Sequence, residues 1–478
     1  MTEVAVRSRA IDVASVNSRR ERLILGAILV VSVLLRVGIA LYLGNVVDAP
    51  RLLTDQRSYH ALGQRLLAGH GFSFDRGWYP FTRADTPTAH WSFLYSLIVA
   101  GIYAVFGAQP LAVRLVQAVV GGVLLPYAVY RLARRVFPPC VRREQAEQRD
   151  LGTAAAPLAA AAMAAGYGYF ALYAATLMTE TLFITVVVWS LDMALGLTEL
   201  LRQGRDPTPA LGFQLGLSMS LGTLLRQSLL PWVPVVLLYL LWSGWRAGRL
   251  GKMVRVVVLV AVMLVASIAP WTLRNYRVYD EFLLLNSNTG YAMYSAQHPM
   301  HGTTFREFDA APLPEDLAWG NEAAMDGQLM QLGIGFVLDE PGRYLLLSLS
   351  RVRAFFKFWP SGDTTLLHSI GRVGSYGLAL PLMVYGLYQV ARNAELRQRS
   401  SLLILFAAFY TLLHVMTWAM VRYRLPVDAI AMPWAGLGVI QLGTRAWDGF
   451  CRLTHTHDGG LTRVVSPIAG CARGKQRR

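Results

Sequence analysis

Long apolar runs recur along the whole chain and set its class. A membrane-spanning helix needs about 20 predominantly apolar residues. Runs that meet or approach this length cover residues 23–43, 113–135, 153–173, 180–199, 209–226, 228–243, 253–271, 372–391, 401–420 and 425–444. The pattern predicts an all-α polytopic membrane protein with about ten transmembrane helices, within a range of about nine to twelve.

Two further apolar segments, 91–106 and 344–359, are ambiguous. The first is short for a span, and the second is interrupted by Arg351, Arg353 and Lys357. Short cytoplasmic loops collect Lys and Arg. The basic stretches 131–149, 246–255 and 392–399 and the basic C-terminal end fall on one side only if both ambiguous segments stay outside as interfacial helices. This parity predicts that both termini are cytoplasmic.

The same topology divides the chain into five regions. We expect a cytoplasmic basic N-terminus, a core transmembrane module that contains the first outer loop, a large outer segment with interfacial helices, a region of C-terminal transmembrane helices, and a cytoplasmic basic tail. Their residue ranges are 1–22, 23–271 (with the loop at 44–112), 272–371, 372–444 and 445–478. The arginine-rich tail is expected to be disordered and to contact membrane lipid.

Composition and charge narrow the function. Hydrophobic residues make up 54% of the chain and charged residues only 15%, whereas soluble proteins carry about 25% charged residues. The formal net charge is +16, which in a soluble protein would suggest a nucleic-acid partner. Here most basic residues lie in predicted cytoplasmic loops and the tail, so we expect no nucleic acid. The arginines that remain on the outer side need another explanation.

Two acidic residues lie at the predicted outer face. Asp55 opens an amphipathic stretch, where it can cap a helix N-terminus or act as a general base. Glu180 lies at the outer mouth between the third and fourth spans. There it can simply be an acid that the helix dipole stabilises in the first turn, or it can belong to a functional site. Two carboxylates in one outer cavity would suit acid–base chemistry or metal binding.

Basic and polar candidates lie at the same level. Arginine binds phosphate in a bidentate manner, although arginines at span ends can also extend toward lipid headgroups. The candidate phosphate ligands are Arg226, Arg274, Arg422 and Arg424, and the candidate substrate contacts are Tyr59, His90, Asn275 and His298. The sequence establishes no cofactor. The sequence contains no metal-binding motif. A divalent metal ion is left open, with Asp55, Glu180 and His298 as the candidate ligands.

An ordered series of short pieces carries a family resemblance over residues 23–442. The pieces are Asp55 with Tyr59 and Gly69-x-Gly71-Phe72, Phe106-Gly107 with Arg114, Met178-Thr179-Glu180, Leu225-Arg226, Pro270-Trp271-x-x-Arg274-Asn275-Tyr276, Asn288-x-Gly290, Pro341-Gly342-x-Tyr344-Leu345 and Arg422-Tyr423-Arg424-Leu425-Pro426. This series resembles the GT-C superfamily of membrane glycosyltransferases, in its bacterial branch related to protein O-mannosyltransferases and lipid A aminoarabinose transferases. The chain departs from many relatives in having Glu180 in place of Asp.

The resemblance implies a function and a place. It implies a glycosyltransferase of the bacterial cytoplasmic membrane with its active site outward, Asp55 as the catalytic base, and Glu180 shaping the donor or acceptor site. A sugar would pass with inversion from a polyprenyl-phosphate-linked donor to a hydroxyl of a glycan, lipid or protein acceptor. Two alternatives remain: a ligase or polymerase of lipid-linked glycans, which would need no carboxylate base, and a non-enzymatic lipid or polyprenol flippase.

Overall fold

The computed structural model describes residues 2–47, 55–138, 151–306, 309, 311–359, 371 and 373–455. Within these ranges the regular structure is helical, and strand pairing is limited to the isolated bridges Ser73–Pro87 and Trp78–Thr82. The predicted all-α class is therefore confirmed.

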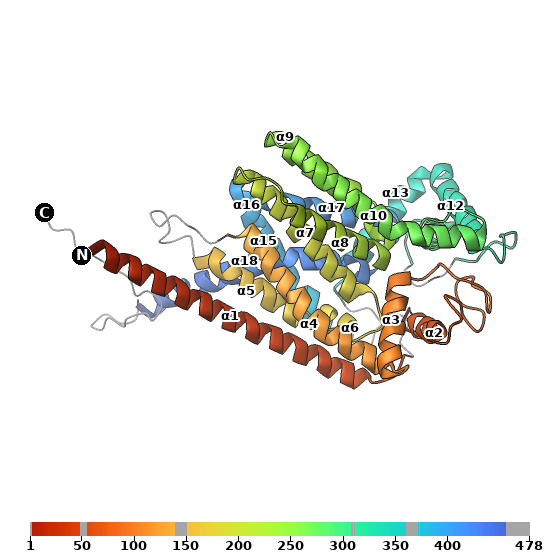
Figure 1. The fold of residues 1–478 in the computed structure, drawn as a ribbon, viewed down its shortest axis with the longest axis horizontal. Helices are drawn as coiled ribbons and strands as arrows, with labels where there is room; N and C mark the ends of the chain where they lie inside the picture. Colours follow the sequence, from red (N-terminus) through yellow and green to blue (C-terminus); the bar gives the residue numbers. More distant parts are fainter. Residues whose placement is uncertain are drawn as a thin grey trace.

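The helices form two groups (Figure 1). Most of them run side by side in an elongated bundle: α1 (Thr2–Leu43), α4 (Pro110–Val136), α5 (Leu151–Gly166), α6 (Gly168–Ala174), α7 (Glu180–Arg202), α8 (Pro209–Leu225), η3 (Gln227–Leu229), α9 (Trp232–Arg246), α10 (Leu250–Tyr279), the π-helix η5 (Val373–Gly377), α15 (Leu378–Arg392), α16 (Ala394–Arg399), α17 (Ser401–Met416) and α18 (Val421–His455). The others gather at one end of that bundle: α2 (Asp55–Leu67), α3 (Phe93–Phe106), α11 (Thr289–Gln297), η4 (Pro299–His301), α12 (Glu322–Asp339) and α13 (Pro341–Phe355).

Several helices are long and apolar enough to cross a membrane. Six described segments qualify, and α5 with α6 form a seventh candidate that is bent by 55°. The predicted runs over α8 and α17 are shorter apolar helices, as is α3. Each predicted run overlaps a helix, so this is a multi-pass membrane protein, whereas the total of ten spans stays a prediction. The predicted interfacial segments 91–106 and 344–359 coincide with α3 and α13.

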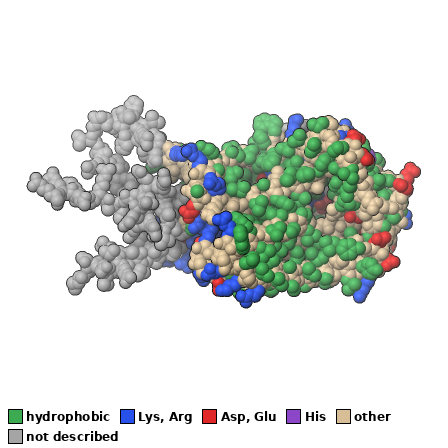
Figure 2. Space-filling view, turned by 90° about the horizontal axis from the view of Figure 1, so that it is seen from above, with side chains coloured by type: hydrophobic (Ala, Val, Ile, Leu, Met, Phe, Trp, Pro, Cys, Tyr) green, Lys and Arg blue, Asp and Glu red, His purple; other side chains and the backbone are tan. Residues whose placement is uncertain are grey.

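The surface has the hydrophobic belt expected of a membrane protein. Figure 2 shows a broad hydrophobic band across the molecule, with basic side chains gathered at one end and acidic side chains at the other. Apolar side chains of α1 such as Leu23, Val30 and Leu34 are exposed. Exposed apolar side chains are stable there only if lipid surrounds them.

Small residues bring α18 close to its neighbours. A side chain at Gly436 would collide with the backbone of Ala156 and Ala160 in α5, and one at Gly386 of α15 would overlap the carbonyl of Trp434. Small residues at helix contacts let membrane helices pack through dispersion forces. These contacts fix α18, whose first turn belongs to the site described below.

Arg36 stabilises the bend between α5 and α6. Its guanidinium is fully buried and donates to Ser32 Oγ at 2.7 Å, Ala165 O at 2.9 Å and Ala164 O at 3.2 Å. Carbonyls in the last turn of a helix lack intrahelical donors, and positive charge is favourable there. Arg36 therefore faces the bundle interior, as its position within an apolar run required.

The predicted C-terminal tail, residues 445–478, is described only as far as His455. α18 continues to His455, so the start of the predicted disordered tail is helical. Residues 456–478 lie outside the described residues. So do the loop segments 48–54, 139–150 and 360–370.

Candidate active site

A large cavity opens where the ends of several helices meet. Its volume is about 1400 Å³. Its walls come from the start of α2, the loop before α3, the turns around α7, α8 and η3, the segment leading into α11, and the junction of α17 with α18. The polar and aromatic lining includes Asp55, Arg57, Tyr59, Trp78, Tyr79, His90, Trp91, Arg226, Gln227, Asn288, Tyr291, His414, Trp418, Arg422 and Tyr423.

Asp55 and Arg422 form an ion pair in this cavity. Asp55 is the first residue of α2, and its Oδ2 accepts from Arg422 Nη1 at 2.6 Å. Arg422 lies in the first turn of α18, 367 residues along the chain. The sequence predicted a carboxylate and an arginine at one membrane face, and the fold brings these two into direct contact.

A second ion pair lies beside the first. Arg226 ends α8 in an extended conformation and donates to Glu180 Oε1 at 2.9 Å. The ring of Tyr423 lies near both arginines, with its centre 4.9 Å from the guanidinium carbon of Arg226 and 5.2 Å from that of Arg422. Glu180 itself is buried and does not line the cavity. Its contact with Arg226 links it to the lining.

Several buried polar atoms of the lining lack partners among the described residues. Arg422 Nε, Trp91 Nε1 and Trp418 Nε1 are donors of this kind, and His414 Nε2 is another such atom. A buried polar atom without a hydrogen bond costs about 1–3 kcal/mol. The lining thus contains polar groups whose hydrogen-bonding capacity the described residues leave unused, as do buried side chains elsewhere, such as Arg36 and Arg351.

His90 presents a defined face to the cavity. Its Nδ1 lies 3.1 Å from the carbonyl oxygen of Ser287. A carbonyl only accepts, so Nδ1 carries the proton and Nε2 of the neutral ring is an acceptor. Burial lowers the pKa of His90, partly offset by the charge of Glu322. The neutral form is therefore the resting form.

Glu322 fastens the loop that carries His90. Its carboxylate is buried and accepts four hydrogen bonds. The donors are Thr82 Oγ1 at 2.6 Å, Ala89 N at 2.8 Å, Ser287 Oγ at 2.9 Å and Thr88 Oγ1 at 3.1 Å. This carboxylate ties the first outer loop to the second.

Asp326, one turn further along α12, holds another wall. Its Oδ1 accepts from Gly290 N at 2.8 Å and Tyr291 N at 3.1 Å. A side chain at residue 290 would overlap the backbone of Asp326, so only glycine fits. Burial raises the pKa of Asp326 to about 7, against the opposing effect of the two amides.

Besides Glu180, four other predicted site residues lie outside the cavity lining. Arg424 is buried and paired with Asp428 at 3.0 Å. Arg274 lies over the rings of Phe72, Phe93 and Tyr279. Asn275 donates to the carbonyls of Leu283 and Leu285, and His298 accepts from Met300 N beside Tyr294 and Phe336. Each has a structural partner that explains its polarity. Tyr59 and His90, by contrast, both line the cavity.

No metal centre is formed within the part of the chain that the structure describes. No group of three or more His, Cys, Asp or Glu side chains lies close enough to hold an ion there. The predicted candidates Asp55 and Glu180 are each bound by an arginine instead.

Comparisons by sequence find no relative. Neither protein-family models nor curated proteins match this chain. Comparisons by structure do find similar folds.

The archaeal oligosaccharyltransferase AglB from Archaeoglobus fulgidus, solved with an inhibitory peptide and a dolichol-phosphate, has a TM-score of 0.52 and 16% identity. The match covers 92% of this chain and 52% of the enzyme. The same enzyme tethered to an acceptor peptide matches with a TM-score of 0.52 and 14% identity, over 91% of this chain and 51% of the enzyme. This chain thus spans about half the length of that enzyme.

ArnT from Cupriavidus metallidurans bound to undecaprenyl phosphate overlaps more loosely, with a TM-score of 0.38 and 15% identity over 90% of this chain and 79% of ArnT. At such identities the AglB match concerns the fold alone. The chain therefore has the same all-helical membrane fold as AglB, in agreement with the GT-C fold that the order of its sequence motifs predicted.

Proposed function

We propose that this protein is a membrane glycosyltransferase that moves a sugar from a polyprenyl-phosphate-linked donor to an acceptor hydroxyl, with inversion. The observation that carries the proposal is the paired arrangement of Asp55 with Arg422 and Glu180 with Arg226 at one cavity. The fold that the chain shares with an oligosaccharyltransferase solved with a dolichol-phosphate supports the same class of donor.

Arg226 and Arg422 are the groups that bind the donor phosphate. Each guanidinium has five N–H donors in a planar fork that matches phosphate oxygens. Both guanidinium groups lie near the Tyr423 ring, and one nitrogen of Arg422 is a buried donor without a protein partner among the described residues. As negative charge develops on the leaving phosphate, such preorganised donors lower the barrier.

Donor binding also prepares the base. With Arg422 bound to Asp55, the carboxylate oxygen Oδ2 is occupied by the hydrogen bond from Arg422 Nη1. A phosphate that draws Arg422 toward itself breaks this hydrogen bond and frees Oδ2 to accept the proton of the acceptor hydroxyl. Glu180, buried behind Arg226, keeps the second arginine in place throughout.

The reaction then follows from these positions. Asp55 takes the proton of the acceptor hydroxyl, whose oxygen attacks the anomeric carbon of the donor sugar. The bond from that carbon to the phosphate oxygen breaks on the opposite face, and polyprenyl phosphate leaves with the bonding electron pair. His90 Nε2 and the aromatic lining of Tyr59, Trp91 and Tyr291 contact the sugar or the acceptor.

The site faces outward from the cytoplasmic membrane in this proposal. The acidic end of the molecule carries the cavity, and the basic end lies opposite, as the sidedness of basic loops requires (Figure 2). A donor in the outer leaflet would reach the cavity laterally with its prenyl chain still in lipid.

The test is transfer by the purified protein in proteoliposomes, with synthetic polyprenyl-phosphate hexoses and pentoses as donors. Products from an added lipid and glycan extract are read by mass spectrometry. Asp55→Asn should abolish transfer, while Asp206→Asn should not. Asp206 is the matched control because it also pairs with an arginine, Arg249 at 2.9 Å, but lies outside the cavity. Full turnover by Asp55→Asn would reject the assignment of the base.

A further inference from the structure

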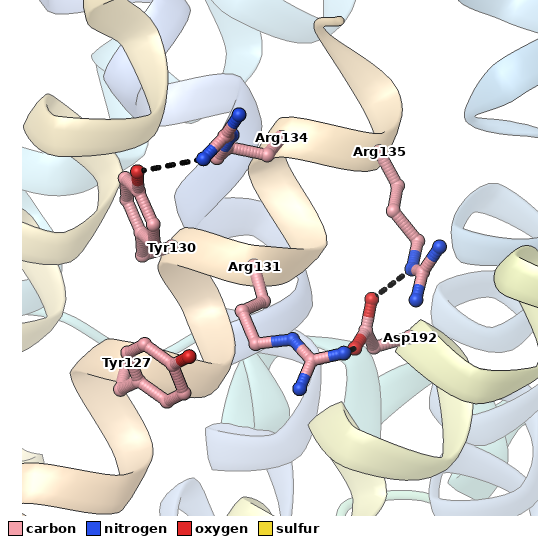
Figure 3. Close-up of a pocket in the computed structure, with 6 residues that line it drawn as sticks. All are labelled: Tyr127, Tyr130, Arg131, Arg134, Arg135 and Asp192. Carbon is pink, nitrogen blue, oxygen red and sulfur yellow. Dashed lines mark hydrogen bonds and ion pairs between the residues drawn. The ribbon is translucent and has the colours of Figure 1, made fainter. Parts of the chain in front are cut away.

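A small basic pocket lies far from the cavity, between the C-terminal half of α4 and the middle of α7. Its volume is about 300 Å³, and Figure 3 shows the side chains that line it: Tyr127, Tyr130, Arg131, Arg134, Arg135 and Asp192. Three guanidinium groups and one carboxylate give this lining a net charge of +2. Nothing in the transfer reaction uses it.

Asp192 and Gly196 of α7 organise two of the arginines. The buried carboxylate of Asp192 binds Arg131 Nη2 at 2.9 Å and Arg135 Nε (Figure 3). One turn later, a side chain at Gly196 would lie about 3.0 Å from the guanidinium of Arg135, so glycine leaves the room that this group occupies. Each ion pair uses one nitrogen, and a guanidinium has donors on three.

Arg134 is placed by a separate contact. Its Nη1 donates to Tyr130 Oη at 3.2 Å, and its guanidinium carbon lies 5.7 Å from the Tyr130 ring centre. Tyr130 Oη in turn donates to Glu21 Oε1 at 2.5 Å. Arg134 is exposed, and no ion pair to Asp192 involves it. Its positive charge is therefore the least compensated in the pocket.

The pocket stands at the polar end of a lipid-facing stripe. Val119, Val123 and Tyr127 are exposed along one face of α4 at four-residue intervals, and Arg131 is the next residue of that face. Arg131 lies about 26 Å along the helix axis from Arg114, which is near the cavity end, at 1.5 Å per residue. This is close to the roughly 30 Å of a hydrocarbon core, so the arginines sit where headgroups of the other leaflet lie.

We infer that this pocket binds the phosphate of an anionic lipid headgroup, with an acyl chain of that lipid along the exposed face of α4. Arginine forks match phosphate oxygens, and basic pockets between transmembrane helices hold anionic headgroups. A soluble phosphate ester offers the same oxygens. The apolar stripe that leads into the pocket favours the lipid, because a soluble ester has no acyl chain that could pack against this stripe.

Native mass spectrometry of the full-length protein in detergent, titrated with phosphatidylglycerol, tests the inference. Arg134→Gln should weaken binding about tenfold, the equivalent of one charged hydrogen bond of about 1.5 kcal/mol. Arg246→Gln is the matched control. Arg246 is also exposed, also lies over an aromatic ring, that of Trp242 at 5.4 Å, and lies outside the pocket. It should bind phosphatidylglycerol like the unaltered protein.

Two further arms identify the ligand. Phosphatidylcholine, whose headgroup has no net charge, should bind at least tenfold more weakly, whereas equal binding of the two lipids would overturn the inference. Glycerol phosphate should not displace the lipid at equimolar concentration, and if it did the phosphate site would stand but its ligand would be a soluble ester.

A second variant guards against indirect effects. Gly196→Ala should weaken phosphatidylglycerol binding by displacing Arg135, without removing any charge. If Arg134→Gln and Gly196→Ala both kept full binding while unfolding at the same temperature as the unaltered protein, the arginines would serve only to pair with Asp192, and the inference would be wrong.

Discussion

Replacing Asp55 by Asn should separate donor binding from turnover. The asparagine keeps the shape of the side chain but has neither the charge that holds Arg422 nor the basicity that accepts a proton. Loss of a general base typically costs a factor of about 10² to 10⁴ in rate. Donor binding should change in the opposite direction, because Arg422 no longer has a carboxylate to leave.

The size of that gain follows from the pair itself. Asp55 Oδ2 and Arg422 Nη1 are 2.6 Å apart, and the two side chains are 23% and 14% exposed. A hydrogen bond between charged groups contributes about 1.5–3 kcal/mol. Because both side chains retain contact with solvent, we take the lower end, about 1.5 kcal/mol, which corresponds to about tenfold tighter binding of polyprenyl phosphate.

The assay is a binding titration of polyprenyl phosphate to the purified protein, run beside single-turnover transfer. Arg422→Gln should weaken binding by about tenfold or more, opposite in sign to Asp55→Asn. Asp206→Asn should change neither quantity. Weaker polyprenyl phosphate binding by Asp55→Asn, or unchanged binding by Arg422→Gln, would refute the exchange of Arg422 between carboxylate and phosphate.

Three further predictions concern the groups around the pair. Arg226→Gln should weaken polyprenyl phosphate binding in the same titration, and Glu180→Gln should weaken it less, since the arginine remains. Glu322→Gln should lower the unfolding temperature, because an amide cannot accept all four hydrogen bonds and strands a buried donor at a cost of about 1–3 kcal/mol. Stability should fall as pH rises from about 4 to about 7, because folded Asp326 keeps its proton over this range while the unfolded carboxyl loses it. Asp326→Asn should flatten that slope in thermal unfolding measured across the same pH range, and an unchanged slope would exclude Asp326 as its source.

Sequence alone was sufficient for the all-helical membrane class, because the length and apolarity of a segment identify a membrane helix. It also placed Asp55, Arg226 and Arg422 at one face, since each ends or begins a helix there. It grouped Arg424 with them, whereas the structure buries Arg424 outside the cavity lining and pairs it with Asp428. Asp428 follows at the i+4 position, where an acid and a base on one helix meet.

The remaining site residues had no local signal. Glu322 is distinguished from the other acids of its segment by its hydrogen-bond donors, three of which are more than 230 residues away along the chain. Glu180 was visible at its helix start, but its burial behind Arg226 depends on how α7 and α8 pack. Periodicity describes which face of a helix is apolar, whereas contacts between distant segments are properties of the assembled chain.

The pairing of Asp55 with Arg422 has a consequence for biogenesis. Asp55 is synthesised early, and its partner Arg422 follows 367 residues later. During that interval the growing chain has a carboxylate in its first outer loop but lacks the α18 arginine of the proposed donor site. A ribosome that stalls, or a product truncated before α18, would thus leave a membrane-inserted fragment unable to consume the lipid-linked donor. The proposed donor site can therefore form only after α18 has been synthesised.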